Sequence, residues 1–133
     1  MADDGIAFDG DTLATGPLGG AETAFVSLAE ALAARRHRVT IHNLCSVSMD
    51  RNGVTWKPLN GELPDTADLY IANRGDRLLT LVPRAKARVF WIHNPAGYLK
   101  KWRYLSKLWR TRPKVVFSSN FHAASFPGWV PSG

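Results

Sequence analysis

The chain has 133 residues, of which 45% are hydrophobic and 21% charged, a composition that is ordinary for one globular domain and argues against general disorder. Its formal net charge of +6 is uneven, because residues 1–73 hold five Lys or Arg and ten Asp or Glu, whereas residues 74–133 hold twelve and one. No apolar run approaches membrane-spanning length and the first residues are acidic where a signal peptide needs positive charge, so we expect a cytoplasmic protein.

The first third of the chain has the pattern of a strand, a helix and a second strand. The apolar run at 5–8 predicts a buried strand, the apolar spacing within 21–36 predicts a helix packed by one face, and the β-branched stretch at 37–45 predicts another strand. Such a βαβ unit makes its two strands parallel neighbours.

The alternation continues to the end of the chain. Strands are predicted at 54–59, 67–73, 87–95 and 114–119, and helices at 77–83, 97–110 and 120–126, the last with Asn120 as its N-cap. This order predicts an α/β fold with a doubly wound, mostly parallel, Rossmann-like sheet and helices on both faces. We expect residues 1–127 to form the domain and residues 128–133 to begin a linker.

A loop rich in glycine stands directly before the first predicted helix. In a doubly wound sheet, ligands bind where the carboxyl ends of strands meet helix N-termini. The loop lacks the G-x-G-x-x-G fingerprint and the G-K-[ST] of a P-loop, which argues against a nicotinamide-dependent dehydrogenase and a P-loop NTPase. Gly19 and Gly20 fit either a tight turn or a phosphate or sugar that approaches main-chain N–H groups, and the residues alone leave both open.

His93 and Asn94 abruptly end the most apolar predicted strand. A histidine there either donates a hydrogen bond near a reacting centre or has a structural role. The other histidines form no metal set. The acids Asp9 and Asp11 are interpreted as loop or capping residues rather than as a divalent-metal pair, so we expect neither a metal nor another cofactor.

The segment 97–110 has the periodicity of a basic amphipathic helix. One face would carry Tyr98, Leu99, Trp102, Leu105, Leu108 and Trp109 and pack on the core, and the other would carry Lys100, Arg103, Lys107 and Arg110. The basic face fits either a solvated surface or, because its charges have one sign and lie beside Trp and Tyr, a surface that meets anionic lipid headgroups or phosphates.

Separated motifs resemble the N-terminal domain of a family 4 glycosyltransferase of the GT-B fold. The family's glycine loop and helix resemble Gly19-Gly20-Ala21-Glu22 and Leu28-Ala29-Glu30-Ala31-Leu32, and the approach to its second strand resembles His37-Arg38-Val39. "WIHNP" resembles the family's strand ending in His, and "VVFSSNFHAASF" resembles its strand-Ser-helix close. Arg36 stands where the family usually has glycine.

The resemblance implies an enzyme that transfers a sugar from a nucleotide-sugar donor to a carbohydrate or lipid-linked acceptor, with retention. It implies that Gly19 and Gly20 contact the donor's diphosphate and sugar, and that His93 is a catalytic residue beside the transferred sugar. Position in the loops adds Asn73, Arg74 and Asn94 as acceptor-binding residues. The family's second domain, which binds the nucleotide sugar, has no counterpart in these residues, so we expect the chain to be inactive by itself. Its alternating strands and helices supply a self-contained core, so we expect it to fold as a monomer.

Two other functions fit the same residues. One is a non-catalytic basic α/β module that binds a phosphorylated or anionic partner, and the other is a related GT-B enzyme such as a nucleotide-sugar epimerase. No motif for DNA or RNA recognition is present, so we expect no nucleic-acid partner.

Overall fold

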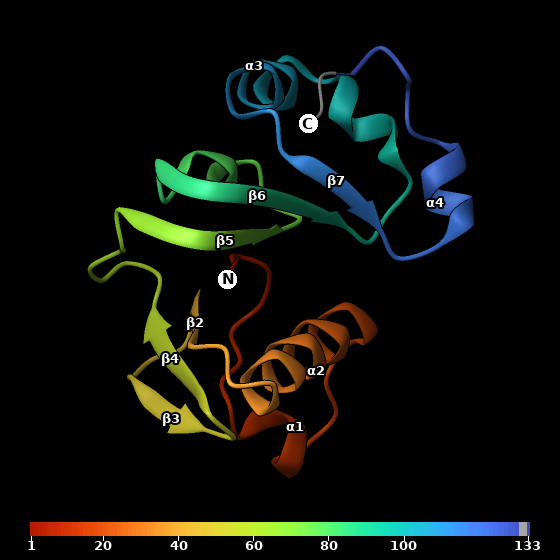
Figure 1. Cartoon of the computed structure of the whole chain (residues 1–133). Helices are drawn as coiled ribbons and strands as arrows, with labels where there is room; N and C mark the ends of the chain where they lie inside the picture. Colours follow the sequence, from red (N-terminus) through yellow and green to blue (C-terminus); the bar gives the residue numbers. More distant parts are fainter. Residues whose placement is uncertain (131–132) are drawn as a thin grey trace. The chain divides into compact units, whose positions relative to one another are not determined.

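The computed structural model describes residues 1–130 and Gly133 (Figure 1). It is an α/β structure of Rossmann-like type with mostly parallel strands, which confirms the predicted fold class. Helices on both faces stay a prediction. The chain divides into two compact units, residues 1–63 and 64–133, and each is considered by itself. Residues 131–132 of the predicted linker lie outside the described residues.

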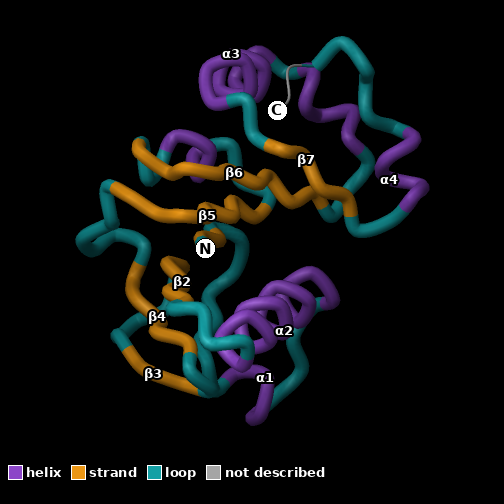
Figure 2. Tube along the Cα trace, in the orientation of Figure 1, coloured by secondary structure: helices purple, strands orange, loops and turns teal. Residues whose placement is uncertain are grey.

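The first unit contains four strands and two helices. The strand order is β3 (Met49–Arg51), β4 (Val54–Pro58), β2 (Val39–Asn43) and β1 (Ala2–Asp3), and the helices are α1 (Thr12–Thr15) and α2 (Gly20–Ala34). Strand β2 is parallel to β1 and to β4, whereas β3 is antiparallel to β4. Helix α2 packs against β2 and β4 (Figure 2). It buries Phe25 and Ala29, as its apolar spacing predicts, and Val26 as well.

The predicted strand at 5–8 is wrong. The strand of this region is β1, Ala2–Asp3, and Ile6 is 51% exposed. Asp3 Oδ1 accepts a hydrogen bond of 2.9 Å from the backbone N–H of Gly5. Such a side-chain turn diverts the backbone from strand pairing, so the apolar residues that follow belong to a loop.

Strand β3 was not predicted, although its turn carries a strong sequence signal. Asn52 and Gly53 join β3 to β4 with φ angles of 50° and 78°. An Asn-Gly pair adopts this left-handed conformation readily, which is why it favours tight hairpins.

In its described residues, the second unit contains three parallel strands in the order β5 (Thr66–Asn73), β6 (Arg84–Ile92) and β7 (Lys114–Phe117). Two short 3₁₀-helices, η1 (Arg77–Thr80) and η2 (Ala96–Lys100), pack against α3 (Trp102–Thr111), and α4 (Asn120–Ala124) follows β7. Leu78, Phe90, Leu99 and Leu108 are among the buried side chains of this unit.

The segment predicted as one helix over 97–110 is two helices. Lys101 has an extended backbone, with φ −65° and ψ 138°, between η2 and α3. The 3₁₀-helix turns every three residues and the extended residue shifts the phase again, so one helical wheel cannot describe both parts. The predicted apolar face is only partly right for α3, because Leu108 is buried as predicted and Tyr104 is buried as well, whereas Trp102 is 79% and Trp109 66% exposed.

The last helix begins where it was predicted, but another residue caps it. The Ser119 side chain, one position before Asn120, accepts a hydrogen bond of 3.2 Å from the backbone N–H of His122. A serine hydroxyl in this position satisfies one of the free N–H groups of the first turn.

Candidate functional site

His93 lies at the carboxyl ends of the three parallel strands of the second unit and is held through both ring nitrogens. Its Nε2 is 2.7 Å from Oδ1 of Asn73, the last residue of β5, and its Nδ1 is 2.8 Å from Oγ of Ser118, which follows β7. Two hydrogen bonds to different strands leave the imidazole one orientation. Ser118, His93 and Asn73 therefore form one chain of hydrogen bonds at this edge of the sheet.

The partners determine which protonation states this histidine can adopt. With its amide oxygen facing the ring, Asn73 accepts a hydrogen bond, so the proton is on Nε2. In the neutral ring, Nδ1 then accepts a hydrogen bond from the Ser118 hydroxyl. Ser118 Oγ also lies 3.1 Å from the carbonyl oxygen of Ile92 and can donate its proton to that oxygen. The hydroxyl oxygen is then free to accept a hydrogen bond from Nδ1–H of a charged His93 ring. The site thus accommodates either form.

The two partners of His93 differ in exposure. Asn73 is fully buried, His93 is half-buried and Ser118 is exposed. The Trp91 ring lies against the imidazole, with its centroid 4.7 Å away. A ligand would therefore reach Nδ1 from the Ser118 side, while Asn73 holds the other edge of the ring.

Arg74 and Asn94 are placed differently from each other. Arg74 directly follows Asn73, has a left-handed backbone with φ 66°, and donates its N–H to the carbonyl oxygen of Trp91 over 3.0 Å. The charge of Arg74 also acts on Tyr98. Burial, and after it the neighbouring Tyr104, raises the pKa of Tyr98 to about 12, and the positive charge of Arg74 opposes that rise. Asn94 is exposed, and within the described residues its side chain makes no hydrogen bond. Asn94 is therefore not part of the His93 hydrogen-bond chain.

Gly19 and Gly20 lie in the first unit, at the start of α2, and their surroundings differ. A Cβ atom on Gly19 would overlap Oε2 of Glu22, whereas one on Gly20 would meet no atom within 4 Å. Glu22 is 6% exposed and lies in the first helical turn, where a carboxylate interacts favourably with the helix dipole. Gly19 thus makes room for an acidic side chain, and Gly20 leaves the backbone open.

The predicted basic face of α3 is partly neutralised. Lys107 Nζ lies 2.6 Å from Oδ2 of Asp76, and Arg103 Nε lies 3.8 Å from Oδ1. Burial raises the pKa of Asp76, but the Lys107 hydrogen bond and the charges of Lys107 and Arg103 outweigh it and lower that pKa below its usual value. Of the four predicted membrane-facing residues, Lys100 and Arg110 make no such ion pair within the described residues.

The acids before α1 have protein partners. Asp9 Oδ1 accepts hydrogen bonds from the backbone N–H groups of Asp11 and Thr12 and from the Thr12 hydroxyl, at 3.0 to 3.1 Å. Asp11 pairs with Arg51 at 2.8 Å. These contacts agree with the interpretation as loop and capping acids. Among the described residues, no group of three His, Cys, Asp or Glu is arranged to hold a metal ion.

Ser118 was missed by sequence reasoning, although a signal for it exists. Strands β6 and β7 are parallel, with Ile92 paired to Phe117, so the next residues, His93 and Ser118, emerge side by side. Both are the first polar residues after an apolar strand. A comparison of strand ends would have nominated the pair.

Comparison of the chain with protein-family models, with curated proteins and with solved structures finds no match. Over residues 1–130 and Gly133, no helix has the length and apolar character needed to cross a membrane.

Proposed function

We propose that this chain is the N-terminal, acceptor-side domain of a GT-B glycosyltransferase that transfers a sugar from a nucleotide-sugar donor to a carbohydrate or lipid-linked acceptor. The observation that carries the proposal is the placement of His93, held through both ring nitrogens at the carboxyl ends of β5, β6 and β7 with one side accessible. This is the edge at which α/β sheets bind ligands.

In the proposed reaction, His93 orients a sugar hydroxyl and stabilises charge, and is not a nucleophile. When the Ser118 hydroxyl turns to the carbonyl oxygen of Ile92, Nδ1 of the neutral ring becomes free to accept a hydrogen bond from a sugar hydroxyl. When the His93 ring is charged, its Nδ1–H would instead donate a hydrogen bond to a substrate oxygen that gains negative charge during the reaction. A preorganised contact of this kind contributes on the order of 100-fold to the rate.

In this proposal, Asn73 and Ser118 are positioning residues. Asn73 is buried and bonded to the ring, which suits holding His93 better than contacting an acceptor. Arg74 and Asn94 remain the residues proposed for the acceptor.

The proposed donor contact falls mainly on Gly20. The open space beside Gly20 allows a sugar or diphosphate to approach the N-terminal turn of α2, where N–H groups face outward. The Glu22 carboxylate repels an anion there, so this loop would contribute only weak diphosphate binding. Most donor contacts would belong to a second domain, and the proposal requires no metal.

The decisive test is His93→Ala in the full-length protein that contains this chain. We expect kcat to fall about 100-fold with the fold intact, because a transition-state contact is lost and little core volume disappears. His37→Ala is the matched control, since His37 is exposed and lies in the other unit. Sugar transfer by His93→Ala within a factor of two of wild type would refute the assignment.

The positioning roles have a readout that does not need activity. Nitrogen-15 NMR of the His93 ring in the 133-residue chain should show Nε2 protonated in the neutral form. Asn73→Asp should raise the pKa of His93, because a carboxylate stabilises the charged ring. Ser118→Ala should remove the Nδ1 hydrogen bond, and Ser118→Thr should restore it. An unchanged ring spectrum in both Asn73→Asp and Ser118→Ala would contradict the hydrogen-bond chain.

We also propose that α3 meets an anionic membrane surface if the acceptor is a lipid. Trp102 and Trp109 are exposed and seven positions apart, so they share one helical face, and Lys100 and Arg110 lie near them in sequence. Binding to phosphatidylglycerol vesicles should weaken with salt and fall when both tryptophans are replaced by serine. Equal binding to neutral and anionic vesicles would contradict this role.

A further inference from the structure

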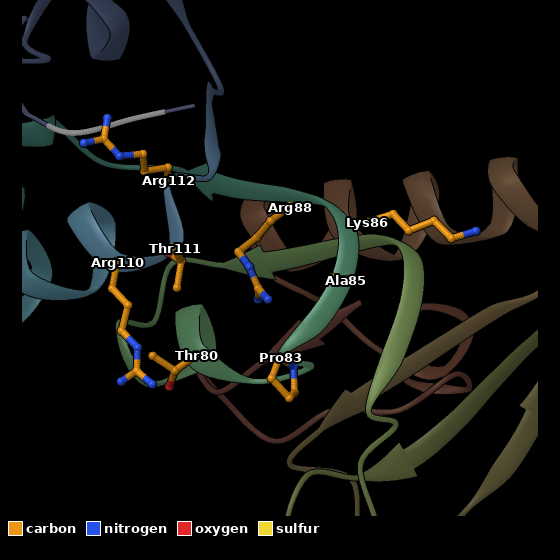
Figure 3. Close-up of a pocket in the computed structure, with 8 residues that line it drawn as sticks. All are labelled: Thr80, Pro83, Ala85, Lys86, Arg88, Arg110, Thr111 and Arg112. Atoms are coloured by element: carbon orange, nitrogen blue, oxygen red, sulfur yellow. The ribbon is translucent and has the colours of Figure 1, made fainter.

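A pocket of about 350 Å³ in the second unit lies away from His93 (Figure 3). It is lined by residues of the first half of β6, of the loop that precedes it and of the end of α3, among them Thr80, Arg88, Arg110, Thr111 and Arg112. None of the lining residues is acidic. His93 instead follows the opposite, carboxyl end of β6.

Arg88 is a half-buried cation whose hydrogen bonds, among the described residues, go to carbonyl oxygens. Its Nη1 donates to the carbonyl oxygen of Leu81 and its Nη2 to that of Val82, both over 2.7 Å, and its guanidinium lies 5.0 Å from the centre of the Tyr70 ring. No carboxylate pairs with Arg88 within the part of the chain that is described. Burial lowers the pKa of Arg88, which reflects the cost of holding this charge away from water.

The carbonyl groups that Arg88 binds belong to a strained turn. Val82 has φ 52°, a left-handed conformation that a β-branched residue adopts rarely. Besides Arg88, the N–H of Ala85 donates to the Val82 carbonyl over 3.1 Å. Strained backbone that is held by several contacts occurs often at ligand-binding sites, and here it lies in the loop beside the pocket.

Arg110 supplies a second, unpaired guanidinium. It is exposed and has no ion pair within the described residues, and Figure 3 shows its side chain extending toward Thr80. The other cations are directed elsewhere. Lys86 points away from the pocket and pairs with Asp68 at 2.6 Å, and the guanidinium of Arg112 also points away.

We propose that this pocket binds the phosphate group of a small phosphorylated ligand through the guanidinium groups of Arg88 and Arg110, with the Thr80 hydroxyl as an additional donor. Planar guanidinium groups match the oxygen geometry of phosphate and form charge-assisted hydrogen bonds with it. A volume of about 350 Å³ exceeds the need of phosphate alone and lies in the range of small-molecule sites, so the ligand carries an organic group as well.

This site does not depend on the proposed sugar transfer. It shares no residue with the His93 site, and it would equally suit a non-catalytic module that binds a phosphorylated partner. A failure of one proposal therefore leaves the other standing.

The test uses the 133-residue chain and two probes, inorganic phosphate and phenyl phosphate, at constant ionic strength set with chloride. We expect saturable amide shifts at residues 80–82 and 110–112 and tighter binding of phenyl phosphate. Arg110→Gln should weaken binding at least tenfold, whereas Lys101→Gln, which removes a charge at the other end of α3, should leave it unchanged.

Three results would overturn the assignment. The first is the absence of saturable shifts in the wild-type chain, and the second is an affinity that Arg110→Gln leaves unchanged. The third is binding to phosphatidic acid vesicles without binding to either soluble probe, which would make the site a lipid-headgroup site. Because Arg110 is exposed, its substitution should leave the fold intact, which circular dichroism checks.

Discussion

Substituting Gly19 and Gly20 separately by alanine tests what the glycine pair does. Gly19 is the N-cap of α2, with φ −61° and ψ 158°, and Gly20 is the first helical residue. Alanine adopts both conformations without strain. The two positions also differ in their surroundings, because a Cβ at position 19 would overlap the Glu22 carboxylate and a Cβ at position 20 would meet no atom within 4 Å.

The expected free energies follow from this difference. Each Gly→Ala change reduces the entropy of the unfolded chain, which stabilises the protein by about 0.5 kcal/mol. At position 20 this gain stands alone. At position 19 alanine is a poorer N-cap than glycine and the end of the Glu22 side chain must shift, which together cost about 1 kcal/mol. We expect Gly20→Ala to be more stable than Gly19→Ala by about 1 kcal/mol, or roughly 4 °C in Tm.

Urea unfolding of the 133-residue chain at pH 7, followed by circular dichroism, measures both values. A double-mutant cycle supplies the control, because in a Glu22→Ala background there is no carboxylate to displace and the difference between the two glycine substitutions should narrow to the N-cap preference for glycine over alanine. Equal stability of the two variants in the wild-type background would refute the reasoning. It would mean that Glu22 has no specific interaction that Gly19 protects.

Three further predictions concern stability. Burial, the N-terminal amine and Lys57 lower the pKa of His42 from 6.5 to about 4. The free energy of unfolding should therefore fall as pH drops from 6.5 toward 4, because the unfolded chain binds a proton that the folded chain does not. Urea unfolding at several pH values measures this dependence, which His42→Leu should flatten. Asp76→Asn should cost about 1.5 kcal/mol at pH 7 by loss of the Lys107 pair; because the pKa of Asp76 is lowered, the two proteins should converge as pH falls below 3.8. Gly53→Ala should cost about 1 kcal/mol by urea unfolding, because φ is 78° there, and a change near zero would contradict this.

The sequence carried enough information to predict most elements. The apolar spacing around Phe25 and Ala29 predicted α2, which begins and ends within two residues of the expected bounds. The apolar runs predicted β2, β4, β5, β6 and β7 and their mostly parallel arrangement. Local patterns suffice here, because burying one face of a helix or a whole strand requires apolar residues at fixed intervals.

Local patterns failed where a single side chain or backbone angle redirected the chain. The hydrogen bond from Gly5 N–H to Asp3 ends β1 early, and the extended backbone at Lys101 separates η2 from α3. Neither feature changes the hydrophobic pattern. Trp102 and Trp109 lie within α3 itself and are exposed, which their apolar character does not indicate.

By itself, then, the sequence determined the fold class, most of the elements and the placement of His93 at a strand end. Only the tertiary structure decided what His93 touches, since Asn73 and Ser118 lie 20 and 25 positions away and reach it through the parallel register of β5, β6 and β7. It also decided that Asp76 neutralises Lys107 and that Arg88 and Arg110 line one pocket. The physical reason is that secondary structure follows from neighbours along the chain, whereas the partners of a polar side chain depend on how separate elements pack.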